Sequence, residues 1–295
     1  MKATAIRVLN PINTRSKGVL FALFGALLMS FDPIFVRFSG TGGFNTVFLF
    51  GLFTSISMPI LIQATDKRGL IGTLKESGWP VVFSGLLMLG SATTLIFSFK
   101  NTSVSNTLFI LSGAPALTAV FARMFLGEKT KKSTWFTIVA VIVGIAIVVS
   151  GSLESGRTFG DALAVLTVIF LSLNMTLLRH YKDVSRMASV GMGGFFLAVF
   201  MFFLAEPSSF TLNTWIIMGI MGLISAPLGR VMSQTSTRYI TAPEAGVINL
   251  TESVIAPVWA FIFFQEIPAV TTVIGGGVIL TSILIFILST SKNNS

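Results

Sequence analysis

The stretch Thr241–Glu266, TAPEAGVINLTESVIAPVWAFIFFQE, is long and apolar enough to form a helix that crosses a lipid bilayer. Glu252 lies near the middle of this stretch. A carboxylate at bilayer depth is energetically costly, so by default it points to a function. Glu252 therefore raises the question of what it meets inside the membrane: a basic side chain, a proton or a bound molecule.

The rest of the chain shares this apolar character. Of its 295 residues, 53% are hydrophobic and only 11% are charged, whereas a soluble domain is usually about 25% charged. Apolar runs of membrane-spanning length recur along the sequence and predict an all-α polytopic membrane protein with ten transmembrane helices. The runs are Gly18–Phe38, Phe44–Ile62, Trp79–Phe99, Thr102–Phe125, Ser133–Ser150, Phe159–Leu178, Ser189–Leu204, Thr214–Ser236, Thr241–Phe264 and Ala269–Leu288.

The composition also excludes several kinds of site. The chain has no Cys and a single His, His180, which rules out disulfides, thiolate metal sites and multi-histidine metal sites. The glycines at Gly275–Gly277 lie in an apolar helix with no strand before them, so they do not form a nucleotide-binding loop. No nucleophile–base set or metal triad can be assembled. We therefore expect neither an enzyme nor a bound cofactor.

Basic residues predict the orientation of the chain. The formal net charge is +9, which in a soluble protein would suggest nucleic-acid binding. In a membrane protein, Lys and Arg instead gather in cytoplasmic connections, and an N-terminus in the cytoplasm places most of the 20 Lys and Arg there. We therefore expect no nucleic-acid partner, with cytoplasmic tails at residues 1–17 and 289–295. The basic turns Lys129–Lys132 and Lys182–Arg186 are interpreted as signals of the same topology.

The sequence contains an internal repeat. Residues of the first apolar run recur in the sixth at a displacement of 142: Ser30 with Ser172, Asp32 with Asn174, and Arg37 with Arg179. Residues of the fourth recur in the ninth at a displacement of 138: Ile110 with Ile248, and Glu128 with Glu266. These matches predict two homologous halves, 18–150 and 151–288. Since each half has an odd number of helices, the second must be inverted, as in alternating-access transporters.

Three motifs carry a family resemblance. The second half opens with FGDALAVL (Phe159–Leu166), the first run ends with FDPIFVR (Phe31–Arg37), and the fourth ends with APALTAVFARMFLGE (Ala114–Glu128). Together they resemble the EamA family of the drug/metabolite transporter superfamily over nearly the whole chain. The ninth run is similar to the family's E-P…G-E signature, with Ser253 in place of the proline and Gln265 in place of the glycine.

This resemblance implies a ten-helix bundle of two inverted five-helix halves. It also implies a transporter of small metabolites in the bacterial inner membrane, often an exporter and in some members an exporter of amino acids. The central cavity would be lined by helices 1, 3, 4, 6, 8 and 9. The departure at Ser253 bears on whether the ninth helix breaks there, and Pro257 could supply a displaced break.

Glu252 is the first candidate site residue. Asn249 and Trp259 lie three residues before it and seven after it, so all three share one helix face. That face could line a cavity in which Glu252 binds an amino group or carries a proton. The alternative is a structural acid paired with Arg230.

Arg230 and Asp32 are the next candidates. Arg230 could bind a carboxylate, could pair with Glu244 or Glu252, or could extend towards the cytoplasmic interface. Asp32 is followed by Pro33, a sequence that can mark a broken helix whose freed carbonyls line a cavity. Asp32 could bind an amine or a proton, or it could cap the next segment or pair with Arg37. Its repeat mate, Asn174, would lie on the other side of the cavity.

The remaining candidates are small hydroxyl or aromatic side chains, for which helix packing is an equally simple explanation: Phe35, Ser91, Thr94, Phe97 and Ser112. Opposite charges at similar depth suggest a zwitterion such as an amino acid. We expect a secondary transporter whose partners are a small-molecule substrate and the lipid bilayer, with Glu252 and Asp32 as candidate proton carriers. An importer with the same fold and a non-transporting membrane scaffold are the alternatives.

Overall fold

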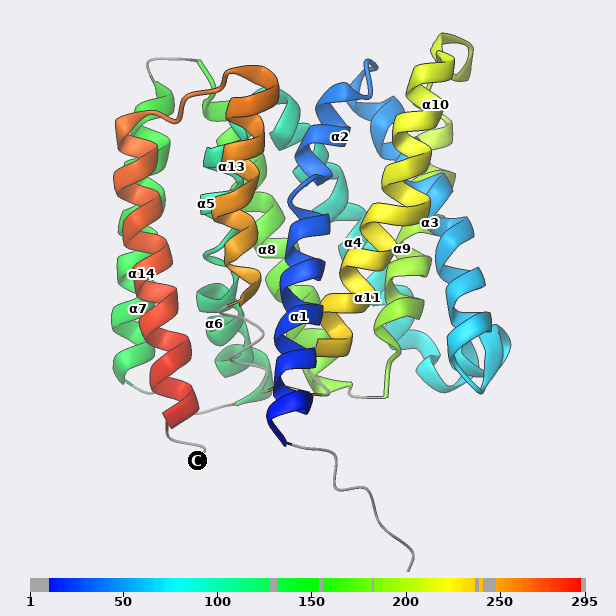
Figure 1. Cartoon of the computed structure of the whole chain (residues 1–295), viewed down its shortest axis with the longest axis horizontal. Helices are drawn as coiled ribbons and strands as arrows, with labels where there is room; N and C mark the ends of the chain where they lie inside the picture. Colours follow the sequence, from blue (N-terminus) through cyan, green and yellow to red (C-terminus); the bar gives the residue numbers. More distant parts are fainter. Residues whose placement is uncertain are drawn as a thin grey trace, which may run out of the picture.

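The computed structural model describes residues 11–127, 132–153, 156–181, 183–236, 239–240 and 248–292. The regular structure of these residues is helical throughout. The helices run between two faces of one bundle (Figure 1). We call the face at which α1 begins and α14 ends the termini face, and the other the opposite face. Glu128 and Glu244, both named in the sequence predictions, lie outside the described residues.

Helix lengths agree with a membrane protein. Seven helical segments of the described chain are long and apolar enough to cross a membrane: Ser16–Phe38, Gly43–Thr65, Gly69–Asn101, Val104–Leu126, Trp135–Leu153, Thr158–His180 and Leu212–Ser233. Three apolar helices are shorter: Arg186–Phe202, Thr251–Phe264 and Val270–Ile285. These shorter helices fall in the seventh, ninth and tenth of the predicted apolar runs.

The elements follow one another in a simple order. They are α1 (Pro11–Met29), α2 (Asp32–Phe38), α3 (Gly43–Thr65), α4 (Gly69–Asn101), α5 (Val104–Leu111), α6 (Ala114–Leu126), α7 (Lys132–Leu153), α8 (Thr158–His180), α9 (Arg186–Phe202), a 3-10 turn (Pro207–Ser209), α10 (Leu212–Gly219), a π-helical segment (Ile220–Ser225), α11 (Ala226–Ser236), α13 (Thr251–Phe264) and α14 (Val270–Lys292). α1 thus begins within the predicted tail 1–17, and α14 extends into the predicted tail 289–295.

The first span is broken in its middle. α1 ends at Met29 and α2 begins at Asp32, with Pro33 in its first turn. Proline lacks a backbone N–H and is tolerated there, because the first N–H groups of a helix have no partner within the helix. The break predicted from the Asp32–Pro33 pair is therefore confirmed.

Two more breaks lie at positions related by the internal repeat. α5 ends at Leu111 and α6 begins at Ala114, a break that sequence analysis did not predict. In the ninth span Leu250 is a turn residue and α13 begins at Thr251, and a displacement of 138 relates Leu250 to Ser112. The displaced break at Pro257 is wrong, because α13 continues through this proline.

The most extensive helix contacts join one half of the sequence to the other. α1 packs against α11, α3 against α9, α4 against α8, and α7 against α14. Figure 1 shows α7 and α14 side by side at one end of the bundle. The buried hydrophobic core therefore lies largely between residues 18–150 and residues 151–288, and a cavity within it is bounded by both.

Glycines allow the closest of these contacts. A Cβ atom added to Gly275 of α14 would lie 2.6 Å from the carbonyl oxygen of Gly144 in α7, and one added to Gly144 would lie 2.9 Å from the oxygen of Gly275. Contacts this short with backbone atoms cannot be relieved by a side-chain rotation. Small residues at helix–helix contacts let backbones approach closely in membranes, so α7 and α14 require glycine at both positions.

This contact yields a matched pair of substitutions. Gly275→Ala should lower the free energy of unfolding by about 1–3 kcal/mol, the usual cost of overpacking. Gly277→Ala should raise it by about 0.5–1 kcal/mol, because a Cβ at Gly277 meets nothing within 4 Å and alanine favours the helix. Equilibrium unfolding in detergent micelles measures both. Equal effects at the two positions would contradict the close packing of α7 and α14.

Candidate functional site

An ion pair lies at the break in the first span. Asp32 is the first residue of α2, and its Oδ2 atom is 3.7 Å from Nη2 of Arg230 in α11. The Asp32 side chain is 12% exposed and that of Arg230 is 25% exposed. The Arg230 guanidinium also donates to the carbonyl oxygen of Ala226 at 3.2 Å and lies over the ring of Phe50, 5.7 Å from its centroid.

These contacts correct two predicted pairings. Among the described acids, the one that pairs with Arg230 is Asp32 and not Glu252, because α1 packs along α11 and brings the break beside Arg230. Arg37, considered as a partner for Asp32, binds Glu266 instead. Arg37 lies five residues further along α2, about 7.5 Å nearer the opposite face, so it cannot reach back to the break.

Glu252 completes a cluster of three ionisable groups. It is the second residue of α13, just past the break at Leu250, and lies within electrostatic range of both Asp32 and Arg230. Among the described residues, Glu252 has no ion-pair or hydrogen-bond partner, and the buried Oδ1 atom of Asp32 has no hydrogen-bond donor. Two acids facing one base leave a surplus negative charge when both are ionised. A proton or an ammonium group would neutralise it.

A cavity of about 470 Å³ lies beside this cluster. Its walls come from α1, α4, α5, α8, α9 and α11, and it extends from the middle of the bundle to Arg186 at the start of α9, near the termini face. The lining residues are Met29, Met88, Ser91, Ala92, Leu95, Leu111, Thr167, Leu171, Asn174, Met175, Leu178, Arg186, Ser189, Val190 and Arg230. The residues predicted for the site that line it directly are Ser91, Asn174 and Arg230.

Trp259 and Asn249 lie outside the cavity lining. The indole nitrogen of Trp259 donates to Ser30 Oγ at 3.1 Å, and its ring stacks on Phe31 with centroids 4.7 Å apart. Asn249 donates to Ser233 Oγ of α11 at 3.0 Å. Trp259 thus supports the broken part of the first span.

The other predicted residues also lie outside the lining: Phe35, Thr94, Phe97 and Ser112. The hydroxyl of Thr94 is 2.8 Å from that of Thr167, which lines the cavity. Ser112 donates to the Phe109 carbonyl at 2.6 Å, at the break between α5 and α6. Phe97 packs edge-on against Phe44, towards the opposite face. Phe35 packs within the hydrophobic core.

Sequence analysis missed three polar residues of the lining: Thr167, Arg186 and Ser189. Arg186 was interpreted only as part of a basic turn. It lies three residues before Ser189, so the two share a helix face. A polar face at the start of an apolar run was the signal that could have placed both on the cavity wall.

Comparison with known proteins decides the family. The chain matches the EamA-like transporter family over residues 16–150 and again over residues 158–288. It belongs to this family. The two matches agree with a duplicated chain, and they make this protein a multi-pass membrane transporter and not an enzyme, as the motifs predicted.

Similar proteins include EamA-family transporters of both directions. The S-adenosylmethionine uptake transporter of Rickettsia prowazekii (strain Madrid E) is 22% identical over 296 residues, which cover 96% of this chain and 97% of the relative. The pseudopaline exporter CntI of Pseudomonas aeruginosa (strain UCBPP-PA14) is 23% identical over 176 residues, covering 57% and 61%. A solved crystal structure with 16% identity has a TM-score of 0.66, covers 92% of this chain and 98% of its own, and supports the fold.

The opposite face of this EamA-family bundle is closed by Arg37. Its guanidinium binds the Glu266 carboxylate and donates to the carbonyl oxygens of Phe99 and Thr102 at 3.1 and 2.8 Å. Glu266 also accepts from the backbone N–H of Val104 at 2.7 Å. These bonds join α2, the connection between α4 and α5, and the residues that follow α13. We call this group the opposite-face seal.

A buried carboxylate forms a second hydrogen-bond network, which shares Thr102 with the opposite-face seal. Asp161, in the first turn of α8, is fully buried and accepts from Thr102 Oγ1 at 2.6 Å and from Asn106 Nδ2 at 3.2 Å. Asn106 bonds in turn to Ser152 and Thr272 at 2.8 and 2.6 Å. The positive N-terminal end of α8 favours an anion at this position. This network ties α5, α7, α8 and α14 together.

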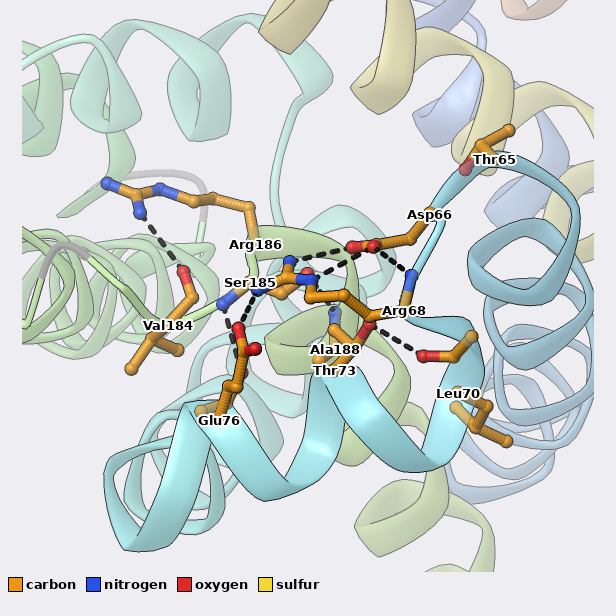
Figure 2. Close-up of polar contacts among 12 residues, drawn as sticks. Thr65, Asp66, Arg68, Leu70, Thr73, Glu76, Val184, Ser185, Arg186 and Ala188 are labelled. Atoms are coloured by element: carbon orange, nitrogen blue, oxygen red, sulfur yellow. Dashed lines mark hydrogen bonds and ion pairs between the residues drawn. The ribbon is translucent and has the colours of Figure 1, made fainter.

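The termini face has a different, solvent-exposed set of contacts (Figure 2). Arg68 pairs with Asp66 at 2.7 Å and with Glu76, and Figure 2 shows both carboxylates directed at its guanidinium. Hydrogen bonds from Arg68 hold the pKa of the Asp66 carboxyl well below its usual value. Arg186, at the cavity edge, donates to the carbonyl oxygen of Val184 at 3.1 Å. Solvent and salt weaken such exposed pairs, so this face is closed less firmly.

The Asp32–Arg230 pair is tested by a double-mutant cycle. Arg230→Gln should lower stability strongly, because it leaves the buried Asp32 without its cation. Asp32→Asn in the Arg230→Gln background should recover part of the loss, giving a coupling energy of about 1–3 kcal/mol in equilibrium unfolding. Asp66→Asn with Arg68→Gln is the matched exposed control, where a smaller coupling is expected. Strict additivity of Asp32→Asn and Arg230→Gln would show that the two groups do not interact.

Proposed function

We propose that this transporter moves small organic zwitterions such as amino acids across the bacterial inner membrane by alternating access, outward from the cytoplasm. The proposal rests on one observation: Arg230, Asp32 and Glu252 form a cluster beside a cavity of about 470 Å³. That volume is within the usual range for small-molecule sites. The direction, the substrate class and the proton coupling are the parts that experiment must decide.

The contact pattern supports ten transmembrane helices in two inverted halves, 18–150 and 151–288. When the helices are numbered as membrane spans, the α1–α11 contact joins the first and eighth spans, and the α8–α4 contact joins the sixth and third spans. Exchanging the halves converts one pair into the other. The α3–α9 and α7–α14 pairs map onto themselves. Inverted repeats of this kind rock against each other around a site between them.

The charged cluster suits a substrate with one carboxylate and one ammonium group. A guanidinium binds a carboxylate through two parallel hydrogen bonds, so Arg230 would hold the acid end of the substrate. The free Oδ1 atom of Asp32 would accept the ammonium group. When Glu252 is protonated, the substrate carboxylate would pair with Arg230 and the substrate ammonium group with Asp32, which leaves no charge unpaired. Met88 and Leu171 of the cavity wall would cover an apolar part of the substrate.

Glu252 is the proposed proton carrier. It lacks a partner among the described residues, yet it lies close enough to Asp32 and Arg230 for its charge to act on both. Protonation of Glu252 would remove the surplus negative charge of the cluster. Proton binding and substrate binding would therefore be coupled through Arg230, which faces both acids.

The cavity and its seals support loading from the cytoplasm. The cavity extends to Arg186 near the termini face, and the predicted gathering of basic residues in cytoplasmic connections supports a cytoplasmic position for this face. The opposite-face seal, centred on Arg37 and Glu266, would have to open for release. Import is the second candidate, favoured by the similarity to an S-adenosylmethionine uptake transporter.

Flux in proteoliposomes tests the proposal. Arg230→Ala should lower amino-acid flux at least about ten-fold, since it removes a charge-assisted hydrogen bond of about 1.5–3 kcal/mol. Glu252→Gln should retain flux but lose its dependence on a pH gradient. Glu206→Gln, an exposed acid away from the cavity, is the control and should change neither. Unchanged flux in Arg230→Ala would remove Arg230 from the site, and an unchanged dependence on the pH gradient in Glu252→Gln would remove Glu252 as the proton carrier. Preferential inward flux would favour the importer.

A further inference from the structure

A chain of three hydrogen-bonded side chains includes two residues of the cavity wall. Ser84 of α4 donates from its hydroxyl to Oδ1 of Asn174 in α8, and the hydroxyls of Ser84 and Ser189 of α9 are hydrogen-bonded to each other. Ser84 and Ser189 are buried, with 0% and 2% of their surfaces exposed. Asn174 and Ser189 both line the cavity. Sequence analysis did not name Ser84.

The hydrogen bond from Ser84 to Oδ1 of Asn174 sets the direction of the other bond in this chain. A serine hydroxyl carries one proton, and that of Ser84 is given to Asn174. Ser189 must therefore be the donor to Ser84. The Oδ1 atom of Asn174 is held by this chain, so its Nδ2 atom, with two N–H donors, is turned away from Ser84. No described residue accepts a hydrogen bond from Asn174 Nδ2, and the cavity lies next to it.

The other polar groups on the wall reinforce this arrangement. The cavity lining contains the guanidinium groups of Arg186 and Arg230 and, among the described residues, no Asp or Glu. Its charged and amide groups are therefore donors. Arg186 is exposed and already donates to the carbonyl oxygens of Val184 and Leu178. The donors that favour a ligand with acceptor oxygens are therefore Asn174 and Arg230. A ligand without such oxygens leaves the N–H groups of Asn174 unpaired.

We infer that Asn174 is a specificity residue that donates to a carbonyl or carboxylate oxygen in the side chain of the substrate. Ser84 and Ser189 are positioning residues that hold the amide in the donating orientation. This inference rests on the proposed function, and it narrows the substrate to zwitterions with an oxygen acceptor on the side chain, of the glutamine and glutamate type. Arg230 would bind the main carboxylate, and Asn174 the side-chain oxygen.

The experiment compares four probes: L-glutamine, L-glutamate, L-leucine and L-methionine. Their affinities are measured by thermal shift and by competition for flux in proteoliposomes, because a ligand of the folded state raises its apparent stability. The wild type should prefer L-glutamine or L-glutamate over L-leucine about ten-fold, the worth of one good hydrogen bond. Asn174→Leu keeps a side chain of similar size but removes both N–H donors without adding a charge. It should abolish the preference for L-glutamine and L-glutamate over L-leucine.

Variants of the two serines separate positioning from structure. Ser84→Ala and Ser189→Ala should reduce the preference for L-glutamine over L-leucine, and Ser84→Thr, which keeps the hydroxyl, should restore it. A loss of affinity that is equal for all four amino acids, with an unchanged ratio, would mean that the chain only packs helices and would overturn the inference. Preference of the wild type for L-leucine would overturn it too. If the wild type binds none of the four probes, both the inference about Asn174 and the proposed substrate class fail.

Discussion

The pairing of Arg230 with Asp32 across the break in the first span is the interaction on which the site depends. Neither charge would be tolerated alone within a membrane-spanning bundle, because a buried unpaired ion costs several kcal/mol. The break turns the Asp32 carboxylate towards α11, and Trp259 supports it through Ser30. Glu252 adds a second acid to the same base, so the cluster is electrically balanced only when a proton or a cationic group joins it.

The two faces of the bundle differ in how they are closed. Partly buried charge-assisted bonds around Arg37 and Glu266, together with the fully buried Asp161 network, hold the opposite face. The termini face has an exposed pair network at Arg68 and a cavity that extends to Arg186. In the proposed alternating-access mechanism, this difference would correspond to the state that is open towards the termini face.

Much of this arrangement could be predicted from particular residues. Asp32, Arg230 and Glu252 were identifiable because ionisable groups are rare in apolar runs, and Pro33 marked the break. The partner of Arg230 was not predictable, because it depends on the packing of α1 along α11, which joins residues far apart in sequence. The break at Ser112 was missed although Pro115 lies in the first turn of α6, as Pro33 does in α2, because no charged residue accompanies it. Arg186 was missed because it lies just before the apolar run Ser189–Leu204, among other basic residues.

The most direct test uses the absence of Cys from the sequence, which lets one introduced thiol report on access. Ser91→Cys places a thiol on the cavity wall, and a membrane-impermeant maleimide can be applied to either side of oriented vesicles. Labelling should be fast from the termini face and slow from the opposite face, and Glu266→Gln should speed labelling from the opposite face by weakening its seal. Equal labelling from both faces, or no response to Glu266→Gln, would contradict a central site reached from alternate sides.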